Sequence, residues 1–482
     1  MDKNLKALTA RNIGYNTISS ILVLLMQFAS NILMARILAP ADYGIVGFAQ
    51  IFINFMMQFG DFGINSALIQ RKDVDRTYLY SGFTLKVLLS VLAFFMLIIL
   101  APASSLFIDH KAIPLVVRVL SVNLLISAFV FLPQVSLTRA LDYKKLAIPQ
   151  MISVAAGSAI AILLAYKGFA YWSIVAGSLL SNLLNALVMY ALRPVPPAFA
   201  WNISVAKNLM QFGWSLLLPG IIIFIIINAD NFAIGTMMGP ESLGYYSIAF
   251  TWGSMISILM GNFFHKVLFP TFSKLQHDLL AIKKAYLTSI RYIAFLALPV
   301  NMLFLVEGKE FLVYILGRGT DRWLPALISF QVLCIYGILR ALLEPIGNVI
   351  VGIGKPQLCL KAVIIVAAIE VALIYPAIAY CGIEGVAIAV TVAYVSQYFI
   401  YMRIIQKEIN TDSSELFGTI KIALIATVLM AFSILCTRHF ISSSLFSMIM
   451  GALVGFVVYL AAYGVLDKFK LFKEISALSR FA

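Results

Sequence analysis

The segment Asn31–Gly47, NILMARILAPADYGIVG, predicts the end of one membrane helix, a tight polar turn and the start of the next helix. Proline and aspartate lie between the two apolar runs, a composition typical of a helix boundary. Two hundred residues later the chain repeats this pattern, and three residues align without a gap: Asn31 with Asn231, Pro40 with Pro240 and Gly44 with Gly244.

A chain that contains the same span–turn–span pattern twice is expected to consist of two copies of one unit. An even number of predicted crossings separates the copies, so both should have the same orientation in the membrane. Some transporters place their substrate path between two such parallel halves. A second, weaker match supports the repeat, because Gly168 and Gly382 each begin the sixth predicted helix of their half.

The composition predicts a multi-pass membrane protein. Of the 482 residues, 62% are hydrophobic and only 12% are charged, whereas soluble domains carry roughly 25% charged residues. The longest polar stretches have about 12 to 20 residues, too few for an extramembrane catalytic domain. We therefore expect no enzyme, and a membrane-embedded glycan transferase is disfavoured because no sizeable loop is available for its chemistry.

About fourteen apolar runs are long enough to cross roughly 30 Å of hydrocarbon, and all should be helical because lipid offers no partner for exposed backbone groups. The expected fold is all-α, with a six-helix lobe at 1–193, a cytoplasmic linker at 194–211, a second six-helix lobe at 212–410, and two additional helices with a cytoplasmic tail at 411–482. The runs lie near 12–36, 43–69, 78–101, 113–138, 147–166, 169–192, 212–237, 243–270, 287–306, 324–353, 360–381, 383–402, 417–437 and 441–466.

The net charge of +14 is explained by membrane topology rather than by nucleic acid. About 25 of the 35 Lys and Arg residues fall in loops on the side of the N-terminus, against about 8 on the opposite side. By the positive-inside rule both termini are predicted to be cytoplasmic. Most of this charge is expected only to set topology and to contact anionic lipid headgroups.

No pattern for a metal or cofactor is present. The four cysteines lie in or beside apolar runs without CxxC spacing, and the four histidines are scattered without ligand spacing. The segment Gly352–Pro356 lacks the serine or threonine and the glycine spacing of a phosphate-binding loop. We expect no metal site, no cofactor and no ATPase activity.

Four stretches are similar to the signature segments of the polysaccharide-transport (Wzx-type) flippases: ARILAPADYGIVGFA at 35–49, FGDFGINSALIQR at 59–71, NADNFAIGTMMGPESLGYYSIA at 228–249 and KVLFPTFSKLQHD at 266–278. This family belongs to the superfamily that includes the MATE drug exporters and the lipid II flippases. The resemblance covers most of residues 1–410. It implies a MATE-like protein of fourteen helices in the bacterial inner membrane.

The resemblance further implies transport of an undecaprenyl-diphosphate-linked oligosaccharide from the cytoplasmic to the periplasmic leaflet. Such units build O-antigen, capsule or another exopolysaccharide, and a polysaccharide polymerase and a chain-length regulator are the implied protein partners. The glycan itself is not specified. Two lobes would enclose a cavity that opens alternately to each leaflet.

Charged residues inside predicted spans should face protein or a wet cavity, because a charge at mid-bilayer costs roughly 2.5–3.5 kcal/mol. Asp61 and Lys86 both lie about 12 Å deep, at 1.5 Å of rise per residue, so they could form an ion pair. Arg340 and Glu344 are four residues apart on one helix and could also pair. For both couples, a purely structural role is the alternative to a role in transport.

The flippase interpretation requires cations to shelter the diphosphate, and arginine suits this task because its planar fork is permanently charged. The ordered candidates are Arg340, Lys86, Arg118, Arg36 and Arg291. Acidic residues could instead bind the H⁺ or Na⁺ that drives transport. Asp230 and Glu370 are the best placed, with Asp61 and Glu344 as further candidates, although hydrogen bonding of Asp230 to Asn228, Asn231 or another helix is an alternative.

A cation-coupled multidrug exporter of the same architecture is the alternative function. Such an exporter would have an acid-rich, aromatic pocket for organic cations, whereas a flippase should have a net basic cavity. Within the predicted spans there are two basic residues, Lys86 and Arg340, against four acidic ones. The count alone leaves both functions open.

Overall fold

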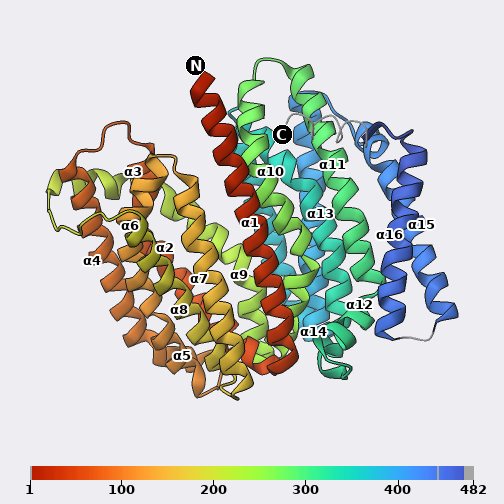
Figure 1. Ribbon diagram of the computed structural model, residues 1–482, viewed down its shortest axis with the longest axis horizontal. Helices are drawn as coiled ribbons and strands as arrows, with labels where there is room; N and C mark the ends of the chain where they lie inside the picture. The colour runs from red at the N-terminus through yellow and green to blue at the C-terminus, as the bar shows by residue number, and fades with distance from the viewer. Residues whose placement is uncertain (1–2, 442–443, 472–482) are drawn as a thin grey trace. The chain divides into compact units, whose positions relative to one another are not determined.

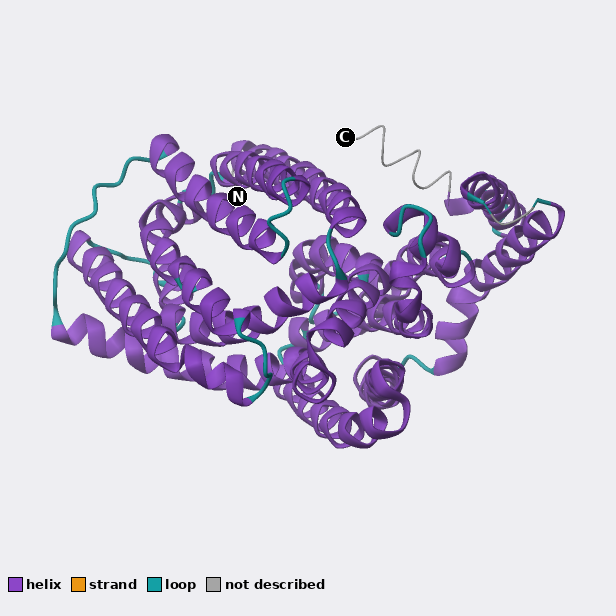
Figure 2. Ribbon diagram, turned by 90° about the horizontal axis from the view of Figure 1, so that it is seen from below, coloured by secondary structure: helices purple, strands orange, loops and turns teal. Residues whose placement is uncertain are grey.

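The computed structural model describes residues 3–441 and 444–471; the side chains of 3–18, 262–267, 269 and 270 are outside the described part. Throughout the described residues the regular structure is helical, without a strand (Figure 2). The expected all-α membrane class is confirmed. Of the predicted C-terminal tail, residues 472–482 lie outside the described residues.

The chain divides into two compact units, Met1–Gly244 and Tyr245–Ala482. The first contains α1 (Lys3–Ile37), α2 (Pro40–Asp61), α3 (Ile64–Gln70), α4 (Arg76–Leu100), α5 (Ala112–Leu120), α6 (Val122–Arg139), α7 (Tyr143–Tyr166) and α8 (Tyr171–Leu192). α9 (Ile203–Gly253) continues across the boundary. The second contains α10 (Met255–Lys274), α11 (Leu279–Val306), α12 (Gly308–Glu310), α13 (Leu327–Gly352), α14 (Pro356–Ile409), α15 (Ser413–Phe440) and α16 (Leu445–Leu466) (Figure 1).

Within the described residues, eleven helices are long and apolar enough to cross a membrane, or twelve if α2 and α3, bent by 41°, form one span. Two of these helices, α9 and α14, have 51 and 54 residues, whereas about 20 residues suffice for one crossing. Each is broken at a glycine in the left-handed region, Gly239 with φ +83° and Gly382 with φ +57°. Each is therefore long enough for two crossings, and the count of fourteen stays a prediction.

The lobe boundaries expected from the sequence also stay predictions. Much of the expected linker at 194–211 is helical, because α9 already begins at Ile203. The segment between α8 and α9 therefore spans 193–202.

The chain bends by 41° between α2 and α3, directly after Asp61 at the end of α2. Phe62 and Gly63 have left-handed backbone angles, φ +44° and +68°, which end α2 at Asp61.

The last carbonyls of a helix such as α3 have no hydrogen-bond partner within the helix itself. The guanidinium of Arg139, at the end of α6, donates to the carbonyls of Leu68, Arg71 and Lys72 at 2.6, 2.6 and 2.9 Å.

The repeated turn forms a reciprocal contact inside the first unit. A Cβ built on Gly44 would lie 1.7 Å from the carbonyl oxygen of Pro240, and a Cβ on Gly244 would lie 1.8 Å from that of Pro40. Each glycine thus lets its own segment approach the backbone of the other segment, at the start of α2 or just after the Gly239 break in α9, which no side chain would permit. The residues that align in sequence are the ones that exchange this contact.

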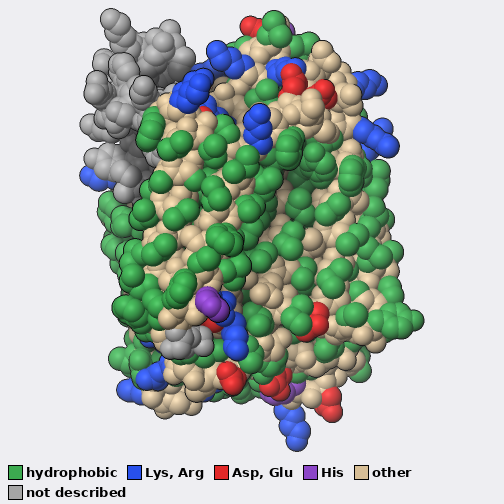
Figure 3. Space-filling model, turned by 90° about the vertical axis from the view of Figure 1, so that its right-hand side faces the viewer, with side chains coloured by type: hydrophobic (Ala, Val, Ile, Leu, Met, Phe, Trp, Pro, Cys, Tyr) green, Lys and Arg blue, Asp and Glu red, His purple; other side chains and the backbone are tan. Residues whose placement is uncertain are grey.

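Apolar side chains fill the interior of each unit. In the first unit a buried cluster joins α3, α4, α6 and α9 and includes Ile64, Phe83, Phe131 and Leu209. In the second, another cluster joins α11, α13 and α14. On the face drawn in Figure 3, charged side chains gather toward the two ends, and mainly apolar and uncharged atoms lie between them. This distribution is the one that a hydrocarbon layer requires.

Candidate functional site

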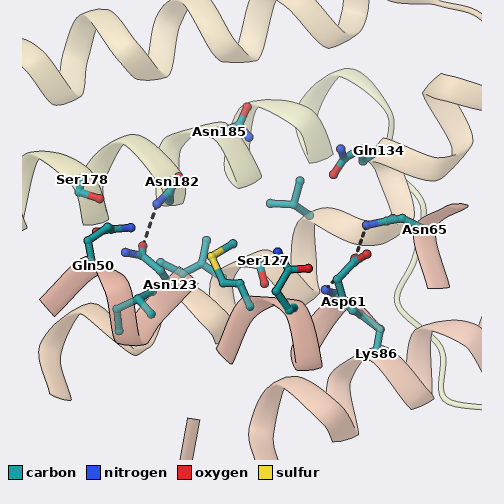
Figure 4. A pocket seen from close by; sticks show the side chains of 15 residues that line it. Gln50, Asp61, Asn65, Lys86, Asn123, Ser127, Gln134, Ser178, Asn182 and Asn185 are labelled. Carbon is teal, nitrogen blue, oxygen red and sulfur yellow. Dashed lines mark hydrogen bonds and ion pairs between the residues drawn. The ribbon is translucent and has the colours of Figure 1, made fainter. Parts of the chain in front are cut away.

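A polar cavity of about 410 Å³ lies among the helices of the first unit (Figure 4). We call it the amide cavity, because seven carboxamide side chains line it: Gln50, Gln58, Asn65, Asn123, Gln134, Asn182 and Asn185. The rest of the lining consists of Ser127, Ser178, Asp61, Lys86, Ile53, Met57, Ile126 and Val130. Apolar membrane helices thus enclose a largely neutral surface of hydrogen-bond donors and acceptors.

Helical spacing brings the amides to one cavity. On α8, Ser178, Asn182 and Asn185 follow at four and three residues, the spacing that places side chains on one helix face. On α6, Asn123 and Ser127 are four residues apart. The two faces meet where Asn182 Nδ2 donates to Asn123 Oδ1 at 2.8 Å, as Figure 4 shows. α2 supplies Gln50, Gln58 and Asp61.

The charges of the amide cavity neutralise each other. Lys86 Nζ lies 3.2 Å from Asp61 Oδ1, so the ion pair expected from equal depth is confirmed. The same oxygen accepts from Asn65 Nδ2 at 2.6 Å. The Lys86 side chain is 5% exposed and that of Asp61 is 38% exposed. The ammonium is therefore committed to a carboxylate, and the cavity carries no net charge from this pair.

A second cavity, of about 280 Å³, lies in the second unit, and we call it the arginine cavity. Residues of α13 and α14 line it: Arg340, Leu343, Glu344, Gly347, Asn348, Val351, Cys359, Tyr394, Gln397 and Tyr401. Arg340 Nη1 donates to the hydroxyl of Tyr336 at 2.9 Å. The Tyr336 ring in turn packs edge-on against Tyr394, with 4.6 Å between ring centroids.

The expected pair between Arg340 and Glu344 is wrong: no ion pair joins them in the described part of the chain. Long helical side chains lean toward the N-terminus of their helix. The guanidinium therefore meets Tyr336, four residues before it, rather than Glu344, four residues after it. Both charges nevertheless line the same cavity.

The other three cationic candidates line neither cavity. Arg118 on α5 is exposed, and Arg36 lies half-buried in the last turn of α1. Arg291 on α11 binds Asp467, just after α16, with Nη2 at 2.8 and 2.7 Å from the two carboxylate oxygens. A role for these three arginines at the diphosphate stays a prediction.

The acidic candidates Asp230 and Glu370 are buried, 2% and 3% exposed, and line neither cavity. Asp230 Oδ1 accepts from the backbone nitrogen and the amide nitrogen of Asn231 at 2.7 and 3.0 Å. The predicted hydrogen bond to Asn231 is therefore confirmed, whereas a role in ion coupling stays a prediction. Among the described residues, no group of three or more His, Cys, Asp or Glu side chains could hold a metal ion.

The carboxamides are the lining residues that the sequence analysis missed. A search for charges passes over Asn and Gln, which carry none. The available signal was the spacing of polar residues within apolar helices, such as Gln50, Asn54 and Gln58 on α2. Four-residue intervals of this kind predict a polar stripe on one helix face.

Comparison with known proteins identifies the family. A model described as "Polysaccharide biosynthesis protein" matches residues 33–327. The chain belongs to this family. It is 22% identical to the lipopolysaccharide biosynthesis protein WzxC of Escherichia coli strain K12, over 81% of this chain and 78% of that protein. It is 23% identical to the teichuronic acid biosynthesis protein TuaB of Bacillus subtilis strain 168, over 71% of each.

The succinoglycan biosynthesis transport protein ExoT of Rhizobium meliloti strain 1021 is 26% identical, and the match spans 57% of this chain and about half, 56%, of ExoT. Among solved structures, the lipid II flippase MurJ in an inward closed conformation matches with a TM-score of 0.76 at 13% identity, over 94% of this chain and 98% of that one. An inward-facing multidrug MATE transporter matches with a TM-score of 0.64 at 17% identity, over 81% and 96%. The expected family and the MATE-like fold are confirmed.

Proposed function

We propose that this protein flips an undecaprenyl-diphosphate-linked oligosaccharide from the cytoplasmic to the periplasmic leaflet of a bacterial inner membrane. The single observation that carries this proposal is the amide cavity among membrane helices. Most of the lining amides are half-buried or exposed, so they can exchange hydrogen bonds with a ligand, and Asn65 Oδ1 and Asn185 Oδ1 are buried without a partner among the described residues. A glycan passing through an apolar layer supplies partners for such groups.

The chemistry of the amide cavity suits sugar hydroxyls. A carboxamide carries both donors and acceptors, so one Asn or Gln can satisfy two neighbouring hydroxyl groups. Sugar hydroxyls are neutral, and the lining is neutral because Asp61 holds Lys86. We assign recognition of the glycan to this cavity. Asn182 and Asn123 are its central pair, since each already orients the other.

We assign the diphosphate to Arg340 in the arginine cavity. In the described part of the chain its one hydrogen bond goes to a neutral hydroxyl, that of Tyr336. Its remaining N–H groups can therefore bind phosphate oxygens in the bidentate geometry that favours arginine. Lys86 is less suitable, because a phosphate would have to displace the Asp61 carboxylate.

Glu344 lines the same cavity as Arg340 and would repel a diphosphate when ionised. Binding of H⁺ or Na⁺ at Glu344 would remove this repulsion. We therefore assign the coupling ion first to Glu344, with Asp230, Glu370 and Asp61 as further candidates. A ligand completes an alternating-access cycle only if it does not bind one end state so tightly that the protein stays there. Release of the ion would restore the negative charge of Glu344, and the resulting repulsion of the diphosphate would help to release the lipid.

The relatives support this function, because the names of WzxC, TuaB and ExoT refer to the biosynthesis or transport of polysaccharides. The glycan would belong to O-antigen, capsule or another exopolysaccharide, and a polymerase and a chain-length regulator are the proposed partners. The excess of Lys and Arg in loops on the N-terminal side supports cytoplasmic termini. The cycle needs no cofactor and no chemical reaction on the substrate.

A multidrug exporter fits the cavities less well. Such a protein should offer acidic and aromatic side chains to organic cations. The amide cavity offers one carboxylate, already paired with Lys86, and its described lining includes no aromatic residue. The arginine cavity has tyrosines but also a cation.

Deletion of the gene in its host tests the proposal. Lipid-linked units should accumulate in the cytoplasmic leaflet and surface polymer should be lost. The wild-type gene should restore both, whereas a gene carrying Arg340→Ala should not. Normal surface polymer after a clean deletion, in a strain without a second copy of such a gene, would contradict the proposed function.

A further inference from the structure

Two buried carboxyl groups and one arginine form a cluster at the end of α11, outside both cavities. Glu307 follows the last residue of α11, and Glu310 ends the short helix α12; each is 2% exposed. Arg438 on α15 donates from Nη2 to Glu310 Oε1 at 2.5 Å and from Nη1 to the carbonyl of Val306 at 3.1 Å. The guanidinium is thus committed to Glu310 and to the backbone.

The Glu307 carboxyl has no such partner. Both of its oxygens are buried without a hydrogen bond in the described part of the chain. Gly451 of α16 packs against this carboxyl group so closely that a Cβ atom added to Gly451 would lie 2.9 Å from Glu307 Oε1. The charged groups that act on Glu307 are Glu310 from α12 and Arg438 from α15, and α16 presents Gly451, which has no side chain, to the carboxyl.

Two carboxyls share one guanidinium here, so full ionisation would leave one negative charge buried and unpaired. Burial without a partner disfavours the charged form of an acid, and a neighbouring carboxylate disfavours it further. Burial, together with the charge of Glu310 and against that of Arg438, raises the pKa of Glu307 from 4.5 to about 7. A proton is the one ligand that removes the surplus charge in so closed a site.

We propose that Glu307 is a proton-binding site whose occupancy controls the packing of α15 and α16 against α11. Loss of the proton creates a second negative charge beside Glu310, and Glu307 then competes for Arg438. That competition weakens the bond from Arg438 to Val306, which joins α15 to the end of α11. It also places a charged oxygen against the Gly451 backbone of α16. This inference is independent of the proposed transport function.

Thermal unfolding of the purified full-length protein over a pH series tests the site. Because the folded state holds the proton more tightly than the unfolded state, the stabilisation is complete below pH 4.5 and is lost as the pH rises to about 7. Glu307→Gln imitates the protonated form. It should remove this part of the pH dependence and raise the Tm above the wild-type value at about pH 8.

Asp321→Asn is the matched control, because Asp321 is an exposed carboxylate of the same unit. It should keep the wild-type slope of Tm against pH. A Glu307→Gln variant with that same slope would overturn the proposal.

Infrared spectroscopy supplies a second measurement, which does not depend on the stability of the Glu307→Gln variant. The wild type should show the band of a protonated carboxylic acid that disappears with a midpoint near pH 7. Glu310→Gln removes the neighbouring charge and leaves Arg438 to Glu307, so the midpoint should move to lower pH. The proposal would also be overturned if the wild-type band disappeared at the pKa of a free glutamate. It would equally be overturned if Glu310→Gln left the midpoint unchanged.

Discussion

The amide cavity and the arginine cavity each contain one acidic and one basic side chain, but their electrostatics differ. In the amide cavity, Lys86 and Asp61 bind each other at 3.2 Å and cancel. In the arginine cavity, Arg340 binds the neutral hydroxyl of Tyr336, and Glu344 lines the wall without an ion pair to it in the described part of the chain. Which charges are paired, and not how many there are, decides which cavity can hold an anion.

The largest expected effect is on the paired side of this comparison. Asp61→Ala leaves the Lys86 ammonium buried without its partner, which should destabilise the protein by about 3 kcal/mol, at the low end of the usual range because Asp61 is 38% exposed. Asp61→Ala combined with Lys86→Met should recover most of that loss. Thermal unfolding in detergent measures both variants. If the double variant is no more stable than the single one, the pair does not neutralise this cavity.

Replacement of Arg340 tests the unpaired side. Arg340→Ala should reduce transport about 100-fold with little loss of stability, since two charge-assisted bonds to phosphate contribute about 1.5–3 kcal/mol each and are not fully additive. Arg340→Lys keeps the charge without the fork and should retain intermediate activity. Lipid-linked units in the cytoplasmic leaflet provide the measurement. Equal activity of Arg340→Ala and wild type would remove the distinction between the two cavities.

The smallest expected effect concerns single amides. Asn182→Ala should lower transport roughly 2- to 10-fold, because one neutral hydrogen bond contributes about 0.5–1.5 kcal/mol. The loss should depend on the glycan, so two strains with different repeat units should be affected unequally. A loss that is the same for every glycan would indicate that the amide cavity supports the fold rather than recognising sugars.

The sequence predicted the fold class and the turns better than the site. Equal depth in neighbouring helices was sufficient to pair Asp61 with Lys86, because membrane thickness fixes the height of each residue. The same reasoning could not foresee Tyr336 as the partner of Arg340, because the direction of a side chain depends on its rotamer and on what surrounds it. The carboxamides were missed because neutral residues do not stand out in a search for charges.

Two glycine breaks illustrate the same limit. Gly239 lies between the predicted runs 212–237 and 243–270, Gly382 lies between 360–381 and 383–402, and both have left-handed backbone angles. Where the compact units divide was not predictable from these turns. The division after Gly244 follows from packing between residues distant in the chain, which composition does not encode.

The reciprocal contact of Gly44 with Pro240 and of Gly244 with Pro40 ties together two positions that are 200 residues apart in the chain. Each segment supplies both the glycine and the carbonyl that the other segment contacts. Neither glycine can gain even a methyl group without displacing the backbone of the other segment, so a substitution at one position also alters the conformation at the other.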